Sequence, residues 1–278
     1  MAEVESTEII YRKALRLAKL NEEFKLIKVN NTFQLESAYF GKSISKRSTR
    51  ISPVELGFIK KVKKYVMNNH IYINFTTNFY SPTDIRYINI KKRPSGTVID
   101  DVIEIDIDEA YWKTAFILGV INEEIYKQGS KQNKDISKST RLIALGSLAK
   151  KIDEYIYKGN KMIKHQQIRS ELTENIWYSI CKRVSDAMWE AKKIANNDFC
   201  LFWVDGIYIK NVPDKVKAIK AVFESYGYRV HTKENLKIEY TDKTASVLNT
   251  ANGKTRPFFL PKNKTNKRYY PDLELKET

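Results

Sequence analysis

Two aspartates, Asp106 and Asp205, each follow a run of apolar residues and stand where the chain is expected to turn. Asp106 comes at the end of the β-branched alternation at residues 102–105, and Asp205 precedes Gly206 between two apolar runs. Two aspartates brought together at the edge of a sheet form the kind of two-metal site that phosphoryl transfer uses, because Mg²⁺ and Mn²⁺ prefer hard oxygen ligands. Each signal alone is weak, since such an aspartate usually caps a helix or makes a turn.

The segments around these aspartates predict the elements that would position them. Residues 102–107 alternate like a strand with one buried face, and a helix is expected from Asp108 towards Gly129. Asp-Gly between two apolar runs is the strongest short-range signal for a β-hairpin, because both turn residues must accept a positive φ. We therefore expect Asp205 at the tip of a hairpin.

Helical spacing of apolar residues predicts three further amphipathic helices. They cover about residues 5–28, 168–195 and a segment opened by Pro213. Residues 130–158 begin as a lysine-rich segment and then become helical, so that Lys138 and Arg141 share one helix face.

The charge of the chain indicates a polyanionic partner. There are 49 lysines and arginines against 33 acidic residues, which gives a formal net charge of +16 over 278 residues. Such an excess destabilises the folded state through self-repulsion, and nucleic acid is the partner that most readily offsets it. A basic surface kept only for solubility is the simpler alternative.

Several classes of protein are excluded or disfavoured by the residue inventory. Two cysteines and three scattered histidines rule out a disulfide scaffold, disfavour a zinc finger and give the histidines no expected role. No apolar run is long enough to cross a bilayer, and the acidic start does not look like a signal peptide. We expect no membrane partner, no secretion, and a cytoplasmic or other reducing intracellular compartment.

The order of the two aspartate motifs resembles that of family B DNA polymerases. The first palm motif of that family, Asp-x-x-Ser-Leu-Tyr-Pro, is similar to residues 106–112, with Asp106 and Tyr111 at the same separation. The third motif, Tyr-Gly-Asp-Thr-Asp-Ser, resembles residues 201–209, where Asp205 matches the second aspartate and Trp203 replaces the first. The resemblance implies that Asp106 and Asp205 bind metal and that Tyr111 lies beneath the incoming sugar. Asp108 is a further candidate metal ligand.

A looser similarity concerns the basic residues. The fingers helix of the family, Lys-x-x-x-Asn-Ser-x-Tyr-Gly, is similar to residues 138–150, although its Asn and Tyr are absent here. By that resemblance Lys138 or Arg141 would bind the triphosphate. Lys233 and Lys237 fall where a palm strand often contacts template or primer. The cluster Lys91, Lys92 and Arg93, on the expected positive face of the N-terminal lobe, is a further candidate for nucleic-acid binding.

Together these features predict an α+β protein in three parts. We expect a small basic α+β lobe at residues 1–98 and a palm-like antiparallel sheet with helices on one face at residues 99–245. The palm-like part would contain a short helical fingers insertion at about 130–158, and residues 246–278 would form a basic tail or rudimentary thumb. The resemblance covers about residues 100–242, and we expect no proofreading exonuclease in the hundred or so residues upstream.

The expected activity is Mg²⁺-dependent or Mn²⁺-dependent addition of dNTPs to the 3′ end of a DNA primer on a template. A protein partner that supplies missing polymerase parts is compatible with so short a chain. Two alternatives stay open: a non-enzymatic nucleic-acid-binding protein with a degenerate palm, and a metal-dependent nuclease that uses the same carboxylates.

Overall fold

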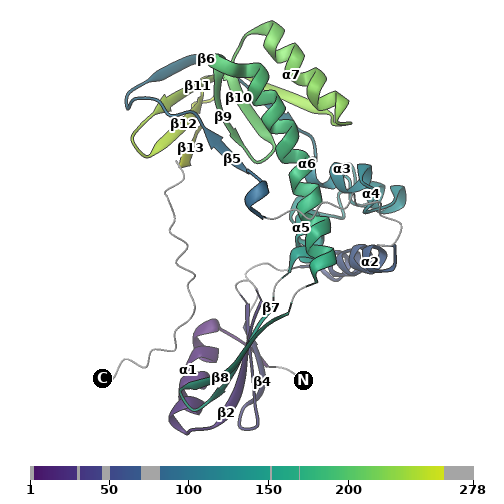
Figure 1. Cartoon of the computed structure of the whole chain (residues 1–278), viewed down its shortest axis with the longest axis vertical. Coiled ribbons are helices and arrows are strands. Elements are labelled where there is room, and N and C mark those ends of the chain that lie inside the picture. The colour runs from purple at the N-terminus through teal and green to yellow at the C-terminus, as the bar shows by residue number, and fades with distance from the viewer. Residues whose placement is uncertain are drawn as a thin grey trace.

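The computed structural model describes residues 3–29, 32–45, 51–69, 82–150, 152–168 and 170–259. These residues form a mixed α+β fold with two sheets, which confirms the expected class (Figure 1). The sheets lie at opposite ends of the molecule, and α2 to α5 lie between them. The seven α-helices of the described residues are α1 (Thr7–Lys19), α2 (Pro53–Asn69), α3 (Ala110–Ile117), α4 (Glu123–Gln128), α5 (Lys138–Gly146), α6 (Glu171–Ala195) and α7 (Pro213–Ser225).

The larger sheet has seven strands and is antiparallel throughout. In spatial order the strands are β13 (Thr255–Phe259), β12 (Thr244–Asn249), β11 (Val230–Tyr240), β6 (Val98–Ile107), β10 (Gly206–Lys210), β9 (Phe199–Trp203) and β5 (Ile88–Ile90). Strand β6 lies near the middle because its β-branched residues fit a buried, pleated position.

Helices cover one face of this sheet. Ile103, Ile105 and Ile107 of β6 belong to the main core; α7 packs against β6, and α6 packs against the strands β9 and β10 beside it. The 25-residue helix α6 is the longest of these, and it begins where the Ser170 hydroxyl accepts a hydrogen bond from the Thr173 backbone N–H. The expected helix at 168–195 is therefore confirmed.

The opposite face of the seven-stranded sheet curls into a half-barrel around a second core. Phe258 of β13 packs edge-on against Trp203 of β9 and Tyr208 of β10, with ring centroids 5.1 and 5.4 Å apart. Because β13 lies at one edge of the sheet and β9 lies near the other, these contacts require the sheet to curl. Of the tail or rudimentary thumb expected at 246–278, the tail is wrong for residues 246–259, which contain the end of β12 and all of β13. Residues 260–278 lie outside the described part.

The smaller sheet has six strands and packs against α1. In spatial order they are β1 (Glu3–Glu5), β4 (Gly41–Ser45), β3 (Thr32–Ser37), β2 (Glu23–Val29), β7 (Ile152–Lys158) and β8 (Lys161–Ile168). All neighbours are antiparallel except β1 and β4. The expected helix at 5–28 is wrong beyond Lys19: Asn21 takes a left-handed φ of 55° just after the helix, and β2 follows.

The helical fingers insertion expected at 130–158 is wrong from residue 152 onwards, where the chain enters β7. Residues 138–146 are helical as expected, but residues 152–158 form β7, whose Tyr155 and Tyr157 pair with Leu26 and Phe24 of β2. Long-range pairing and burial against α1 decide the conformation here.

The expected boundary at residue 98 is wrong as well. Helix α2 packs on α5, and its Phe58, Val62 and Val66 belong to the main core. Strand β5 pairs with β9 of the seven-stranded sheet. The small lobe is therefore built from residues 3–45 and 152–168, so far as the structure describes them.

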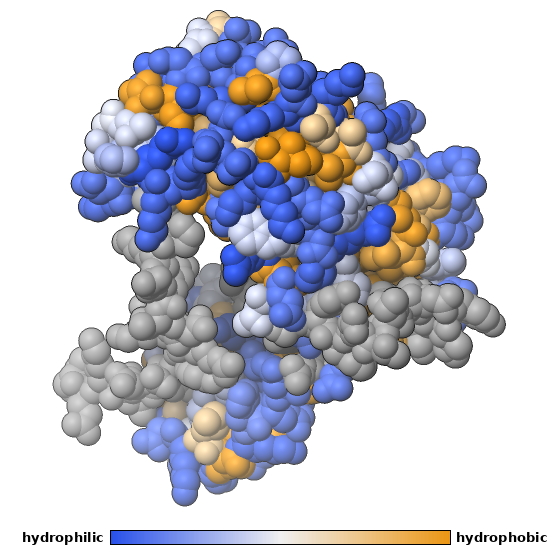
Figure 2. Space-filling view, turned by 45° about the horizontal axis from the view of Figure 1, so that its top comes forward, coloured by the Kyte–Doolittle hydropathy of each residue, from blue (hydrophilic) through white to orange (hydrophobic). Residues whose placement is uncertain are grey.

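The visible surface in Figure 2 is mostly hydrophilic, with apolar residues in separate patches. Within the described residues, no helix has the length and apolar character that a membrane span needs.

Candidate active site

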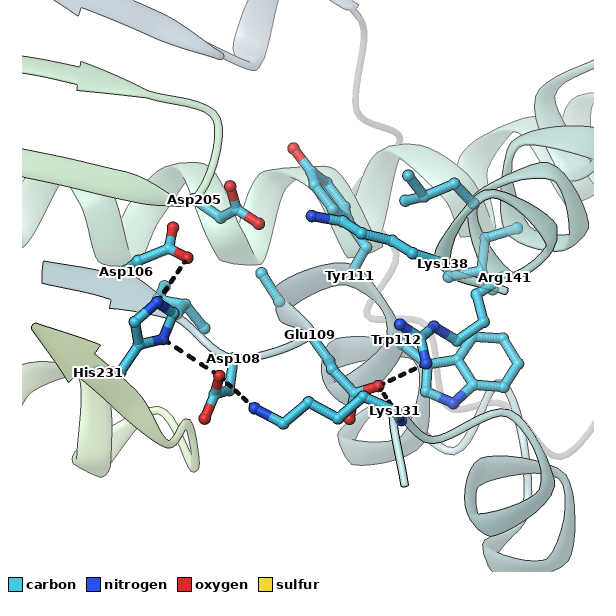
Figure 3. Close-up of a pocket in the computed structure, with 14 residues that line it drawn as sticks. Asp106, Asp108, Glu109, Tyr111, Trp112, Lys131, Lys138, Arg141, Asp205 and His231 are labelled. Atoms are coloured by element: carbon cyan, nitrogen blue, oxygen red, sulfur yellow. Dashed lines mark hydrogen bonds and ion pairs between the residues drawn. The ribbon is translucent and has the colours of Figure 1, made fainter. Parts of the chain in front are cut away.

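Asp106, near the end of β6, and Asp205, in the turn between β9 and β10, lie close together at one end of the half-barrel. Strands β6 and β10 pair so that Asp106 faces Gly206, and the Ile107 backbone N–H donates to the Asp205 carbonyl oxygen at 2.9 Å. A Cβ atom on Gly206 would lie 3.0 Å from Asp106 Oδ1, so a glycine at this position leaves room for the carboxylate. Figure 3 shows the two carboxylates side by side at one end of a pocket.

The hairpin that carries Asp205 is shifted by one residue from the expected turn. Trp203 pairs with Gly206, which leaves Val204 and Asp205 as the two turn residues and makes Gly206 the first residue of β10. Val204 has a φ of 61°, a left-handed conformation that is strained for a β-branched residue. Its backbone N–H donates to the Tyr87 carbonyl oxygen at 2.6 Å, so a neighbouring segment holds the turn.

The two carboxylates are in an unfavourable environment for negative charge. Burial, followed by the charges of Asp205 and Glu104, raises the pKa of Asp106 to about 6. Burial also raises the pKa of Asp205, against the opposing charge of Lys138. Glu104 itself is paired: it accepts hydrogen bonds from Tyr208 Oη and Lys233 Nζ, both at 2.6 Å.

The third candidate ligand, Asp108, is engaged by basic groups. Its Oδ1 lies 2.7 Å from Lys131 Nζ and 3.2 Å from His231 Nδ1. Burial acts to raise the pKa of Asp108, but the hydrogen bond and charge of Lys131, together with His231, hold it below its usual value. His231 lies opposite Asp106 on β11, with Nε2 3.5 Å from Asp106 Oδ2.

A cavity of about 300 Å³ extends from the carboxylates towards α3 and α5 (Figure 3). Tyr111 of α3 lines it, although the side chain is buried and stacks on Trp177 with centroids 5.7 Å apart. Lys138, the first residue of α5, reaches in from the opposite side and is exposed. No ion pair of Lys138 occurs within the part of the chain that the structure describes.

Arg141, the other phosphate candidate, is buried and already has partners. Its Nη1 donates to Glu109 Oε1 and to the Gly129 carbonyl oxygen, both at 2.8 Å. Of the two predicted phosphate ligands, the structure leaves only Lys138 available to a substrate in the cavity.

Of the remaining basic residues predicted to bind nucleic acid, only Lys233 lies beside the acidic pair. Lys233 lies beside the carboxylates through its contact with Glu104, whereas Lys237 lies further along β11, 3.4 Å from Glu239 Oε1. Lys91, Lys92 and Arg93 follow β5 near the far end of β9, where the Lys91 N–H donates to the Cys200 carbonyl oxygen, so they are not brought to the acidic pair.

Three basic residues near the site escaped the sequence reasoning. Lys131 and His231 contact Asp108, and the charge of Arg256 on β13 acts on Asp205. The alternation of His231 with Lys233 along one strand was the available signal for His231. For Arg256 there was none, since β13 was expected to be a tail.

The two aspartates fit a divalent cation. Among the described residues, no group of three or more histidine, cysteine, aspartate or glutamate side chains is arranged to hold a metal. Mg²⁺, however, is commonly bound by only one or two carboxylates together with water and substrate phosphates. Asp106 and Asp205 supply two such oxygen donors, and their pKa values are raised chiefly by burial, with a further contribution from neighbouring carboxylates, so a bound cation would favour the charged forms.

In comparisons with known proteins, the chain matches no protein-family model and no curated protein.

Proposed function

We propose that this protein is a small template-directed DNA polymerase of the palm type. The supporting observation is the convergence of Asp106, on β6, and Asp205, in the turn before its partner strand β10, across a cavity from Lys138, which has no ion pair among the described residues. The reaction joins the 3′-hydroxyl oxygen of a primer to the α-phosphorus of a nucleotide and releases pyrophosphate.

Each residue has a role in this proposal. Asp106 and Asp205 hold Mg²⁺ or Mn²⁺, which, when bound, stabilises charge on the reacting phosphate oxygens. Lys138 binds the phosphates of the nucleotide, and Tyr111 and its neighbours on α3 form the wall against which the nucleotide lies. Lys233, His231 and Arg256 surround the other side of the acidic pair, where the primer strand would carry its negative charge.

A non-enzymatic nucleic-acid-binding protein is the second candidate, and the state of Arg141 favours it. That side chain is held by Glu109 and Gly129, so a single lysine is left for a triphosphate. A degenerate palm would retain the basic surface and lose nucleotide binding.

Incubation of the protein with a labelled primer-template, Mg²⁺ and dNTPs separates the possibilities. Extension of the primer supports the polymerase, an unchanged primer supports the binding protein, and shortening of the primer indicates a nuclease. Omission of Mg²⁺, with EDTA present, is the control that should abolish either reaction.

Nucleic-acid binding itself has an independent test. With a net charge of +16, binding should release condensed counterions, so we expect the Kd for duplex DNA to rise at least about 100-fold between roughly 50 and 200 mM salt. A Kd that does not change with salt would contradict an electrostatic interaction with DNA.

A further inference from the structure

Glu109 occupies the turn between β6 and α3 in an unusual conformation. Its φ of 53° is left-handed, and its side chain makes no capping hydrogen bond to α3. The carboxylate lies instead against α5 and the loop before it: Oε1 accepts from Arg141 Nη1 at 2.8 Å and from the Lys131 backbone N–H at 2.7 Å. Both charged side chains are buried, with 11% of Glu109 and 8% of Arg141 exposed.

The same pair reaches a third segment. Arg141 also donates to the Gly129 carbonyl oxygen, at the end of α4. Gly129 is packed directly against Trp112, since a Cβ there would lie 2.4 Å from Trp112 Cζ2. One buried ion pair therefore ties the turn that follows Asp106, the loop at residues 129–131 and the middle of α5 to one another.

A separate carboxylate fixes the beginning of α5. Glu55 of α2 accepts hydrogen bonds from Ser137 Oγ at 2.6 Å and Thr140 Oγ1 at 2.5 Å. Lys138 lies between this anchor and Arg141, three residues away on the same face of the helix. The position of the Lys138 amine relative to Asp205 thus depends on both anchors.

We propose that Glu109 and Arg141 are positioning residues that hold Lys138 in place to bind the phosphates of a nucleotide. This role rests on the proposed polymerase function. A buried ion pair contributes little net stability compared with apolar side chains of similar size, so stability alone is a weak reason for charges at this position. What the pair supplies is a fixed distance between the carboxylate turn and the helix that carries the phosphate ligand.

The test compares Arg141→Met, Glu109→Gln and the double variant in primer extension. We expect Arg141→Met to raise KM for dNTPs about tenfold or more, with kcat within about threefold, because Lys138 loses its fixed position while Asp106 and Asp205 keep theirs. The double variant should resemble Arg141→Met, since the two residues act as one unit. Glu123→Gln, which removes an exposed carboxylate from α4, is the matched control. Unchanged KM in folded Arg141→Met would overturn the proposal.

A second measurement does not depend on catalysis. The pair should protect the backbone amides of Lys131 and of α5, so hydrogen exchange at these amides should be faster in Arg141→Met than in the wild type. Faster exchange in a protein that never extends primers would reject the polymerase and keep the positioning contact. If the exchange rates of these amides in Arg141→Met equal those of the wild type, the positioning role of the Glu109–Arg141 pair is rejected, whether or not the protein extends primers. If Arg141→Met does not fold, the same two readouts in Glu109→Gln and Arg141→Lys decide, with the same outcomes.

Discussion

Two carboxylate environments, one on each sheet of this protein, contrast with each other. On the six-stranded sheet, Glu154 lies 2.5 Å from Lys25 Nζ and also accepts a hydrogen bond from Gln166, and chiefly the Lys25 contact lowers its pKa. At the end of the seven-stranded sheet, Asp106 and Asp205 converge, and burial and neighbouring charge raise their pKa values. The first arrangement is complete without a further ion, whereas the second leaves negative charge that a cation would balance.

This difference distinguishes a carboxylate with a structural role, Glu154, from the carboxylates of the candidate site, Asp106 and Asp205. The pairing of Glu154 with Lys25 needs no metal or substrate to balance its charge. Carboxylates that oppose each other destabilise the protein, and such strain is typical of sites that bind a metal or substrate. If Asp106 and Asp205 bind a metal, their removal should affect activity far more than the removal of a paired or exposed carboxylate.

The largest expected effect is that of Asp205→Asn on primer extension. The asparagine keeps the size of the side chain and tolerates the turn, but it removes a charge that the metals require, so extension should fall at least about 100-fold. Asp100→Asn, at an exposed aspartate on β6, is the matched control and should retain full activity. Equal activity of the two variants would place Asp205 among the merely structural carboxylates.

The next effect concerns Lys138, the cation that faces the acidic pair across the cavity. A charged hydrogen bond to phosphate stabilises a complex by about 1.5–3 kcal/mol, so Lys138→Gln should raise KM for dNTPs roughly 10-fold to 100-fold. Lys134→Gln, an exposed lysine in the preceding loop, serves as the control. If both variants raise KM equally, Lys138 acts only through general charge.

How much of this site could be predicted from the sequence depends on the range of the interactions involved. The strand before Asp106 was predictable because local alternation determines it. Asp-Gly indicated a hairpin at Asp205, although the turn lies one residue earlier, at Val204 and Asp205. Strand β7 was mistaken for helix because its conformation depends on pairing with β2, far away in the chain. Arg141 was a reasonable phosphate ligand until the fold placed Glu109 beside it.

The raised pKa of Asp106 predicts how stability depends on pH in the absence of metal. The fold favours the protonated carboxyl, so its stabilising contribution is full below about pH 4 and is lost as pH rises through about 6. Asp106→Asn should remove this dependence and stabilise the metal-free protein at pH 7 by about 1–3 kcal/mol. Urea unfolding of both proteins across this pH range, with EDTA, measures the difference. Equal stability of the wild type and Asp106→Asn at pH 7 would mean that the surroundings of Asp106 balance its negative charge, as Lys25 balances that of Glu154.

The smallest effect, and the one with the most specific sign, concerns Val204. At most positions in a strand or helix, glycine is less stable than alanine by about 0.5–1 kcal/mol. At a φ of 61° the order should reverse, because only glycine adopts this conformation without steric cost. Val204→Ala removes the γ-carbons and keeps the strain, whereas Val204→Gly removes both, so the glycine variant should be the more stable of the two by up to about 1 kcal/mol. Urea unfolding of the two variants gives this difference directly, and a more stable alanine variant would show that Val204 does not hold a left-handed conformation in solution.

Primer extension by the same two variants tests what holds Asp205 in place. If the strain is imposed by the hydrogen bonds that the Val204 N–H donates to the Tyr87 carbonyl and the Ile107 N–H donates to the Asp205 carbonyl, Asp205 stays in place without the valine and both variants keep their activity. A glycine variant that is stable but inactive would show that the valine side chain itself holds the carboxylate at the site.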